Sequence, residues 1–373
     1  MNNLFNISVV LGTRPEAIKF AILLKKLKKL EHIKTKIILT GQHRESVREI
    51  FQLFELEEDI NFNIMKHQQS LSYITREVLL KLEEEFKNNN PDLILVQGDT
   101  SSAFAASLAA FYKKIPIAHI EAGLRTNNLY NPYPEEANRR IISQLSTLNF
   151  APTEECANNL RKEGVKSLIK ITGNTVIDSL LYIEKNAIDK IKHKEYNSKE
   201  FILVTIHRRE SWGTPLVDIT QGLLLILKEH QELNIVIPMH PNKIVRDILI
   251  KFLGKHKRVI LLEPLNYVDF IFAIKNCKLI ITDSGGLQEE APSFGKPVLI
   301  LRETTERVEA LETGTAKLIG TNQQKIFKET NKLLKNKNEY MKMSKKINPF
   351  GDGFASNKII DSILLFLNSK KKI

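Results

Sequence analysis

The segment Leu279-Ile280-Ile281-Thr282-Asp283-Ser284-Gly285-Gly286-Leu287-Gln288-Glu289-Glu290 decides the fold of this chain. An apolar run stops at a polar turn with two glycines, and a helical pattern follows, which predicts a strand, a tight loop and a helix. Unpaired N–H groups at a helix N-terminus favour an anion, and glycines let the backbone approach a phosphate closely. Two interpretations of the loop are open at this point: a seat for a nucleotide diphosphate, and an ordinary turn capped by Ser284.

Similar patterns on either side of this segment predict two doubly wound α/β domains. Strands are expected at residues 7–11, 36–40, 93–97, 115–120, 148–151, 201–206, 234–238, 259–262, 279–282, 298–301 and 316–319. Strands that alternate with helices form parallel sheets with right-handed crossovers. Because 373 residues are too many for one ordinary core, we expect two domains in series, with a cleft between the carboxyl edges of their sheets.

The alternation is interrupted between about residues 172 and 200 by a turn, a helix and a lysine-rich stretch. We interpret this region as the linker. It predicts a first domain at residues 1–172 and a second at residues 173–356, followed by a tail with helical periodicity.

Composition limits the partners that are expected. The net charge is +12, but the lysines are spread out and not interleaved with aromatic residues, which argues against a nucleic-acid partner. Cys156 and Cys277 are too few for a disulfide framework and indicate a reducing compartment. We recognise neither a signal peptide nor an apolar run of about 20 residues. We therefore expect a cytoplasmic protein with no membrane segment.

The segment Gly12-Thr13-Arg14-Pro15-Glu16-Ala17-Ile18-Lys19 follows the first expected strand. Thr13 and Glu16 have the spacing of a capping box. Arg14 and Lys19 would then lie in the first turns of a helix at the carboxyl end of a strand, where open α/β sheets bind ligands. The alternative is an amphipathic helix with a surface arginine and lysine.

Carboxylates follow the later strands of the first half. Asp99 and Glu121 each come after a strand, and Glu135 opens a helix that carries Arg139 one turn later. Singly, such residues are often helix caps or dipole partners. Together they suggest crowded carboxylates in which one pKa rises and a base–acid pair results.

The strand ends of the second half carry cations, imidazoles and peptide N–H groups instead. His207 ends the first strand, His240 ends the second, and Arg307 comes after the fifth. A lone histidine is usually structural, but His207 stands beside two arginines, which favours a ligand. Glu289 or Glu290 is a candidate acceptor for a ribose hydroxyl. This half therefore predicts a diphosphate site.

Motifs for other chemistries are missing from the sequence. The nine histidines show no paired metal-ligand spacing, so no metal is expected. Neither half has G-x-G-x-x-G after its first strand, so no dinucleotide cofactor is expected.

These segments, taken in order, resemble the non-hydrolysing UDP-N-acetylglucosamine 2-epimerase family, which interconverts UDP-GlcNAc and UDP-ManNAc. The resemblance covers nearly the whole chain and is carried by Gly12 to Lys19, Gly98 to Thr100, His119 to Thr126, Pro134 to Arg139, Thr172 to Thr175, His207 to Glu210, Thr282 to Pro292 and Thr304 to Arg307. It implies the glycosyltransferase-B architecture of two Rossmann-like domains, with helix 357–369 packed back on the first. It also implies a homodimer and a role in polysaccharide biosynthesis.

The resemblance assigns roles residue by residue. It implies catalytic roles for Asp99, Glu121, Glu135 and His207. It implies contacts to UDP or the sugar for Arg14, Lys19, Arg139, Ser284, Gly285, Gly286, Glu290 and Arg307. It implies a second, allosteric UDP-GlcNAc site, known in some members, for Gln42, His43, Gln69, Arg208 and His240. The sequence departs from the family pattern around Gln69 and His240, where a glycine and a His-x-Asn-Pro pattern are usual.

The residues also suit the chemistry. The proton on C2 of the sugar is not acidic, so an enzyme must either oxidise a neighbouring carbon or expel UDP first to give a glycal. With no nicotinamide motif and many cations for a leaving diphosphate, the sequence favours elimination and re-addition. The alternatives are a hydrolysing 2-epimerase, a 2-epimerase of a UDP-2,3-diacetamido uronic acid, a glycosyltransferase, and a nucleotide-sugar sensor without turnover.

Overall fold

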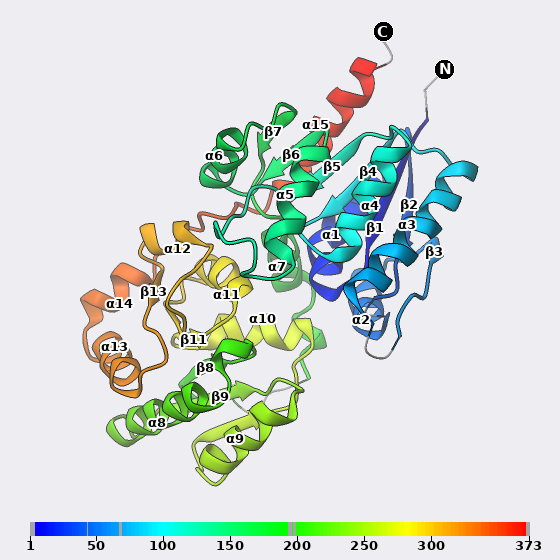
Figure 1. Ribbon diagram of the computed structural model, residues 1–373. Helices are drawn as coiled ribbons and strands as arrows, with labels where there is room; N and C mark the ends of the chain where they lie inside the picture. Colours follow the sequence, from blue (N-terminus) through cyan, green and yellow to red (C-terminus); the bar gives the residue numbers. More distant parts are fainter. Residues whose placement is uncertain (1–3, 43, 67–68, 193–195, 197–198, 371–373) are drawn as a thin grey trace. The chain divides into compact units, whose positions relative to one another are not determined.

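The computed structural model describes residues 4–42, 44–66, 69–192, 196 and 199–370, and the chain divides into two compact units (Figure 1). The first unit comprises Met1–Ser179 and Phe350–Ile373, and the second comprises Leu180–Pro349. Each unit is built on one all-parallel sheet flanked by helices, so the predicted fold class is confirmed. No helix in the described ranges is long and apolar enough to cross a lipid bilayer.

The first unit holds a seven-stranded sheet in the order β3-β2-β1-β4-β5-β6-β7. Its strands are β1 (Phe5–Leu11), β2 (Ile33–Leu39), β3 (Ile60–Asn61), β4 (Leu93–Gln97), β5 (Ile117–Ile120), β6 (Leu148–Ala151) and β7 (Leu168–Ile171). Its helices are α1 (Arg14–Leu27), α2 (Arg44–Phe54), α3 (Leu71–Asn88), α4 (Ser101–Tyr112), α5 (Glu135–Leu145), α6 (Glu154–Lys162), the start of α7 (Thr175–Asn186), and α15 (Ala355–Lys370).

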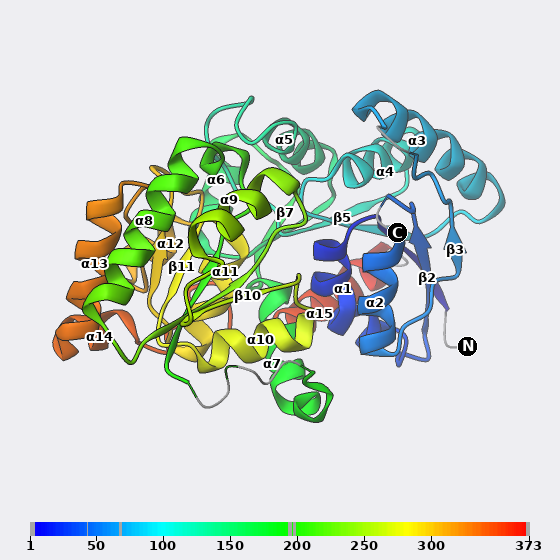
Figure 2. The same cartoon turned by 90° about the horizontal axis from the view of Figure 1, so that it is seen from below.

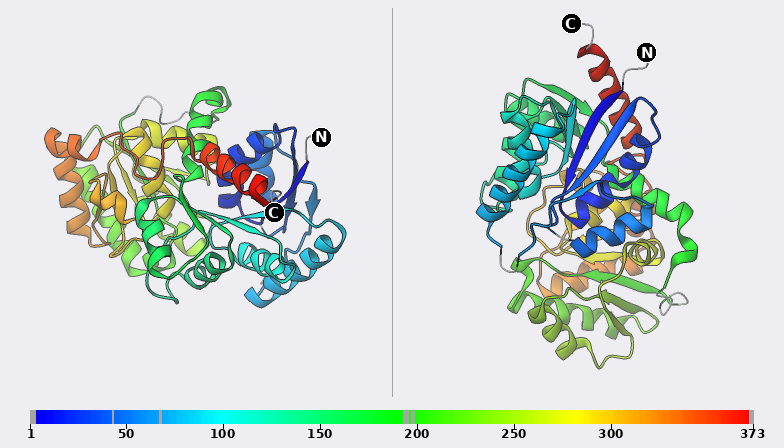
Figure 3. Two further views of the ribbon diagram at one scale, coloured as in Figure 1. Left: turned by 90° about the horizontal axis from the view of Figure 1, so that it is seen from above. Right: turned by 90° about the vertical axis from the view of Figure 1, so that its right-hand side faces the viewer.

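Helices cover both faces of this sheet (Figure 3). On one face, apolar residues of α3 and alanines of α4 pack on β1, β2 and β4. On the other, α1 packs against α2 and α15 (Figure 2). Small side chains let α4 approach the sheet and α3 closely, because alanine adds little bulk. The C-terminal helix therefore belongs to the core of the first unit.

The second unit holds a six-stranded sheet in the order β10-β9-β8-β11-β12-β13. Its strands are β8 (Phe201–Thr205), β9 (Asn234–Pro238), β10 (Val259–Leu262), β11 (Ile280–Thr282), β12 (Val298–Ile300) and β13 (Ala316–Leu318). Its helices are the rest of α7, α8 (Thr214–Glu229), α9 (Lys243–Leu253), α10 (Tyr267–Asn276), α11 (Gly285–Glu290), α12 (Val308–Glu312), α13 (Gln323–Lys335) and α14 (Lys337–Met343). Apolar residues of α8, α9 and α13 cover one face of the sheet.

Both sheets reverse their strand order once, and this reversal places the candidate residues. In the first unit the order turns between β1 and β4, and in the second between β8 and β11. The loops after such a pair of strands diverge to opposite faces and leave room for a ligand at the carboxyl edge. Arg14 and Asp99 follow β1 and β4, whereas His207 and Ser284 follow β8 and β11.

We expect Gly123→Ala to lower the free energy of unfolding of the first unit by about 3 kcal/mol or more. Gly123 has φ +94°, and a Cβ there would lie 2.1 Å from the carbonyl oxygen of Cys156, a backbone atom that cannot move aside alone. The matched control is Gly164→Ala. Gly164 has φ +73° with open space around it, so only the backbone strain of about 1 kcal/mol applies. Urea unfolding followed by circular dichroism measures both, and equal losses would contradict the steric argument.

Candidate active site

Glu16 organises the loop after β1. Its buried carboxylate accepts hydrogen bonds from the backbone N–H of Gly12 (3.0 Å) and Thr13 (2.7 Å), and from the hydroxyls of Thr13 (2.7 Å) and Thr100 (2.8 Å). The predicted capping box is therefore confirmed. Burial is the largest influence and raises the pKa of Glu16, although these donors act against it. The box fixes α1, whose first residue is the half-buried Arg14.

Glu121 has an unusual backbone conformation, and three described side chains bind its carboxylate. Its φ is +65°, a left-handed conformation that costs a non-glycine residue about 1 kcal/mol or more. Lys19 and Asn174 (2.8 Å) donate to Oε1, and Gln97 donates to Oε2. The carboxylate is almost completely buried, so these donors are what keeps its charge tolerable there. Strain of this kind concentrates at functional sites.

Asp99 pairs with Arg139, whereas Glu121 pairs with Lys19. Its Oδ2 accepts from Nε (3.0 Å) and Nη2 (2.5 Å) of Arg139, and Asn138 donates to its backbone carbonyl (2.9 Å). Glu136, which is fully buried, accepts in turn from Arg139 Nη1 (3.3 Å) and Arg140 Nε (2.9 Å). The sequence suggested mutual repulsion among carboxylates. The structure instead gives Asp99 and Glu121 a basic partner each.

Glu135, the remaining predicted carboxylate, is half-buried at the start of α5. Its neighbour Glu136 was not predicted. The two adjacent glutamates cannot be told apart by sequence position, because only packing decides which one turns inward. Arg139 lies one helical turn from Glu135 and so connects the start of α5 with Asp99.

His119 fixes the turn that carries Asp99. It is fully buried on β5, and its Nε2 lies 2.7 Å from the carbonyl oxygen of Gly98. A carbonyl can only accept, so Nε2 carries the proton and donates. Burial lowers the pKa of His119 from 6.5 to about 4, and the nearby charges of Asp99 and Glu121 act weakly in the opposite direction. The imidazole is therefore neutral near pH 7.

Asp283 orients His207 in the second unit. The buried Asp283 carboxylate accepts from the backbone N–H of His207 (3.0 Å) and Arg208 (2.9 Å), from Ser211 Oγ (2.8 Å), and from Nδ1 of the His207 ring (3.0 Å). Burial alone would raise the pKa of Asp283, but the bonds from His207, Arg208 and Ser211 outweigh it and lower that pKa. With Nδ1 on Asp283, the ring presents Nε2 to a ligand. No pattern in the sequence predicts this pairing of His207 with Asp283, because the two residues are 76 positions apart.

Three arginines meet three carboxylates beside this pair. Arg307 donates Nε to Glu289 (2.9 Å) and also pairs with Glu306, whereas Arg302 pairs with Glu306 (3.0 Å) and Glu210 (3.3 Å). Arg208 lies 3.6 Å from Glu306. Burial would raise the pKa of Glu306, but the three guanidinium groups lower it far below its usual range. Of the candidate ribose acceptors, Glu289 is thus already engaged by Arg307.

The loop that follows β11 has the form predicted for an anion seat. Ser284 occupies the N-cap position of α11, but its side chain makes no capping bond, so the plain-turn interpretation loses its main support. A Cβ on Gly285 would lie 2.7 Å from Arg307 Nη1, so glycine lets this guanidinium lie against the backbone. A Cβ on Gly286 would meet nothing closer than Ser284 Oγ at 3.9 Å. The backbone of Gly286 is accessible, and Glu290 is buried at the far end of the helix.

The residues proposed for an allosteric site are divided between the units. Gln42 accepts from Ser102 Oγ (2.9 Å), and Gln69 accepts from the backbone N–H of Lys66 (3.4 Å) in the first unit. Arg208 and His240 lie in the second unit, where the ring centroids of His240 and His207 are 6.4 Å apart. Burial lowers the pKa of His240, and the neighbouring His207 adds to this effect. His43 lies outside the described residues.

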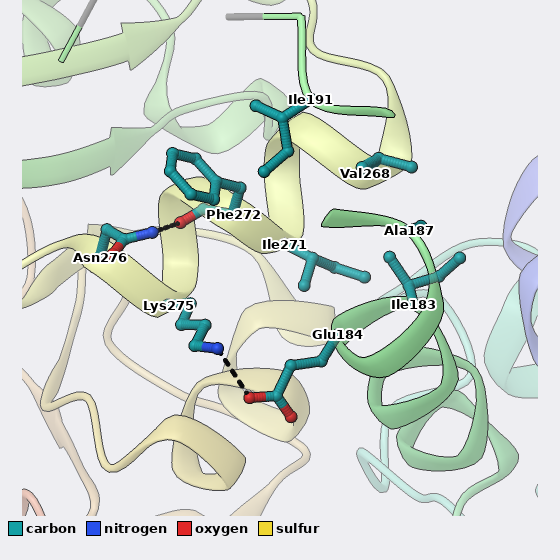
Figure 4. Close-up of a pocket in the computed structure, with 9 residues that line it drawn as sticks. All are labelled: Ile183, Glu184, Ala187, Ile191, Val268, Ile271, Phe272, Lys275 and Asn276. Atoms are coloured by element: carbon teal, nitrogen blue, oxygen red, sulfur yellow. Dashed lines mark hydrogen bonds and ion pairs between the residues drawn. The ribbon is translucent and has the colours of Figure 1, made fainter. Parts of the chain in front are cut away.

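An apolar cavity of about 240 Å³ opens between α7 and α10 in the second unit (Figure 4). Ile183, Ile271 and Phe272 line it, and the ion pair of Lys275 with Glu184 (3.0 Å) spans its edge. It contains none of the predicted site residues and does not suit a charged nucleotide. Within the described ranges, no group of three or more His, Cys, Asp and Glu side chains is arranged to hold a metal ion.

Cys156 and Cys277 are both buried and unbridged. Burial raises the pKa of Cys277 to about 12, which excludes a thiolate nucleophile at neutral pH.

Comparison with known proteins identifies relatives over nearly the whole chain. A family model described as UDP-N-acetylglucosamine 2-epimerase matches residues 25–364. The UDP-N-acetylglucosamine 2-epimerase of Escherichia coli K12 is 46% identical over 364 residues, which cover 95% of this chain and 97% of the relative.

Two solved structures extend this similarity to the fold. The UDP-GlcNAc 2-epimerase of Neisseria meningitidis, bound to UDP-GlcNAc, is 44% identical with a TM-score of 0.89, and the match covers 96% of this chain and 99% of the other. The Staphylococcus aureus protein MnaA, bound to UDP, is 44% identical with a TM-score of 0.91, covering 98% and 97%.

We expect His119 to make the first unit less stable as the pH falls from 6.5 towards 4. Because its pKa is about 4 in the folded chain and 6.5 when solvated, the unfolded chain takes up the proton first. The stabilisation is complete above pH 6.5, and about 3 kcal/mol is lost by pH 4. His119→Gln keeps an N–H donor for Gly98 but cannot titrate. Hydrogen exchange of β4 and β5 amides at pH 7 and pH 5 measures the difference, and equal pH dependence in both proteins would contradict it.

Proposed function

The chain belongs to the UDP-N-acetylglucosamine 2-epimerase family, and we propose that it interconverts UDP-GlcNAc and UDP-ManNAc by reversible epimerisation at C2 of the sugar. The reaction proceeds by elimination of UDP, formation of 2-acetamidoglucal and re-addition of UDP, without hydrolysis and without a cofactor. The observation that carries the proposal is Glu121: a buried carboxylate kept in a strained left-handed conformation and bound by Lys19, Asn174 and Gln97.

The two units contribute different parts of the chemistry. We assign proton transfer at C2 to the first unit, with Asp99, Glu121 and Glu135 as the candidate acids and bases and Arg14, Lys19 and Arg139 as the cations beside them. We assign UDP to the second unit, to His207, Ser284, Gly285, Gly286, Glu290 and Arg307. The Asp283 contact supports His207 as a donor, because it occupies Nδ1 and leaves Nε2 for a phosphate oxygen.

Each half of the reaction is balanced by these groups. In elimination, a carboxylate removes the C2 proton, the C–H electron pair forms the C1–C2 double bond, and the C1–O bond breaks as UDP leaves with its electron pair. In re-addition, a UDP oxygen forms the C1–O bond again while a carboxylic acid gives a proton to C2 from the opposite face. Donors placed in advance at the departing diphosphate lower the barrier because they need no reorganisation.

We also propose a cytoplasmic homodimer that supplies a polysaccharide pathway. The buried, unbridged cysteines agree with a reducing compartment. The dimer and the pathway rest on the family resemblance.

The experiment that tests the function is NMR of the purified protein with UDP-GlcNAc in D2O, followed by the same measurement from UDP-ManNAc. Elimination and re-addition require that the C2 proton exchanges with solvent, so both epimers should acquire deuterium at C2. Epimerisation without deuterium at C2 would exclude a glycal route. Accumulation of free ManNAc and UDP would show hydrolysis, and tight binding without turnover would indicate a sensor.

We expect Gly286→Ala to weaken UDP binding about tenfold or more while the unliganded protein stays as stable as before. The new methyl group meets no protein atom closer than 3.9 Å, and alanine favours a helix over glycine, so only a ligand near the backbone would be displaced. Gly314→Ala, in open space in the second unit but with φ +71°, serves as the affinity control: it should lose about 1 kcal/mol of stability through backbone strain and keep wild-type UDP affinity. Calorimetric titration with UDP measures both affinities, and wild-type affinity in Gly286→Ala would contradict a phosphate seat at this loop.

A further inference from the structure

Of the three described side chains that bind the Glu121 carboxylate, Asn174 is the one that lies where the chain passes between the units. It directly precedes α7, the helix through which the chain leaves the first unit at residues 179 and 180. Its backbone N–H donates to the carbonyl of Phe350 (2.6 Å), the residue at which the chain returns. The outgoing and returning segments are therefore hydrogen-bonded to each other at this residue.

Other contacts hold the two segments together at the same place. Gly173 has φ +87°, and a Cβ there would lie 3.2 Å from Cα of Gly351, so the backbones touch. The side chain of Asp178 accepts from the backbone N–H of Ala355 (3.1 Å) and Ser356 (2.8 Å), which open α15. The backbone of Asn174 is therefore held in place by the returning segment as well as by the residues next to it in sequence.

The side chain of Asn174 uses both ends of its amide. Oδ1 accepts from the backbone N–H of Val176 (3.1 Å) in the first turn of α7, and Nδ2 donates to Glu121 Oε1 (2.8 Å). Capping α7 needs only an acceptor, which Ser, Thr or Asp would supply equally well. Ser and Thr have one short hydroxyl for both roles, and Asp has no donor, whereas asparagine carries its acceptor oxygen and its N–H donor on separate atoms. The donor is therefore the property that capping does not explain.

From this geometry we infer that Asn174 is a positioning residue for the reaction, which aims the Glu121 carboxylate at C2 of the sugar and ties its placement to the junction of the outgoing and returning chain. The inference rests on the proposed function for the identity of the reaction. Lys19 supplies the charge that Glu121 needs, and Gln97 holds the other carboxylate oxygen. Asn174 supplies a neutral, directional bond that fixes the rotation of Oε1.

The test compares Asn174→Ser and Asn174→Asp. Both keep an oxygen for the cap of α7, so the helix stays capped. Because Glu121 is buried, loss of its donor should lower the urea midpoint slightly in the serine variant, and a second carboxylate should lower it further in the aspartate variant, so kcat is compared per mole of folded protein. The serine hydroxyl is one bond shorter than the amide, so while it caps α7 it does not reach Glu121 Oε1, and aspartate places a second carboxylate there. We expect kcat to fall about 10- to 100-fold in the serine variant and further in the aspartate variant, with KM for UDP-GlcNAc changed less than threefold. The side chain of Asn322 caps α13 in the second unit, so Asn322→Ser and Asn322→Asp are the matched controls and should keep wild-type kcat.

Capping alone predicts that all four variants keep wild-type kcat, and that result would overturn the inference. If the wild type itself shows no epimerisation, the proposed function fails first. The inference is then tested by 13C NMR titration of the Glu121 carboxyl group. Among its described neighbours, the charged Lys19 and the titratable His119 are unchanged in the variants. Loss of the donor in Asn174→Ser should move the titration midpoint of Glu121 to higher pH. Equal midpoints in wild type and variant would overturn the inference on that route.

Discussion

The reversal of strand order at the centre of each parallel sheet is the constraint on which the rest of the structure depends. Helices after β1 and β4 must go to opposite faces of the first sheet, as must those after β8 and β11 in the second. The four loops at these positions cannot be covered by their own helices, so they must satisfy their backbone groups with short polar side chains. This explains why a capping box follows β1, a left-handed glycine follows β4, and an aspartate that binds two backbone N–H groups follows β11.

Buried charge in these loops is balanced locally, and this balance limits how an anion can be recognised. Arg208, Arg302 and Arg307 carry three positive charges, and Glu210, Glu289 and Glu306 carry three negative ones among the contacts described. A diphosphate would therefore meet no large net charge from this cluster. Its attraction must come from donors that are already aimed, namely guanidinium N–H groups held in place by carboxylates, the Nε2 of His207 and backbone N–H groups. Such preorganisation suits a leaving group that must return, since the donors stay in place while UDP is detached.

Local patterns allowed most of the fold to be predicted, and long-range partners account for what was missed. The eleven strands expected from apolar runs are all present, whereas β3 with two residues and the exposed edge strand β7 have no such run and were missed. The candidate residues were found because they follow strands, but their partners were not. Lys19 and Glu121 are 102 residues apart, and His207 and Asp283 are 76 apart. Sequence spacing cannot show such contacts, so the pairing of Lys19 with Glu121 was not predicted.

The clearest sign of function comes from comparing two equivalent positions. β4 and β5 are adjacent parallel strands, paired up to Gln97 and Ile120, and the next residue of each is left-handed: Gly98 with φ +68° and Glu121 with φ +65°. Glycine adopts this conformation without strain, so it is the residue that stability alone would place at both. A Cβ on Gly98 would lie 3.3 Å from Glu121 Oε2, so the glycine also leaves room for that carboxylate. The fold thus accepts strain of about 1 kcal/mol or more in order to keep a carboxylate at this point, which a purely structural role does not explain.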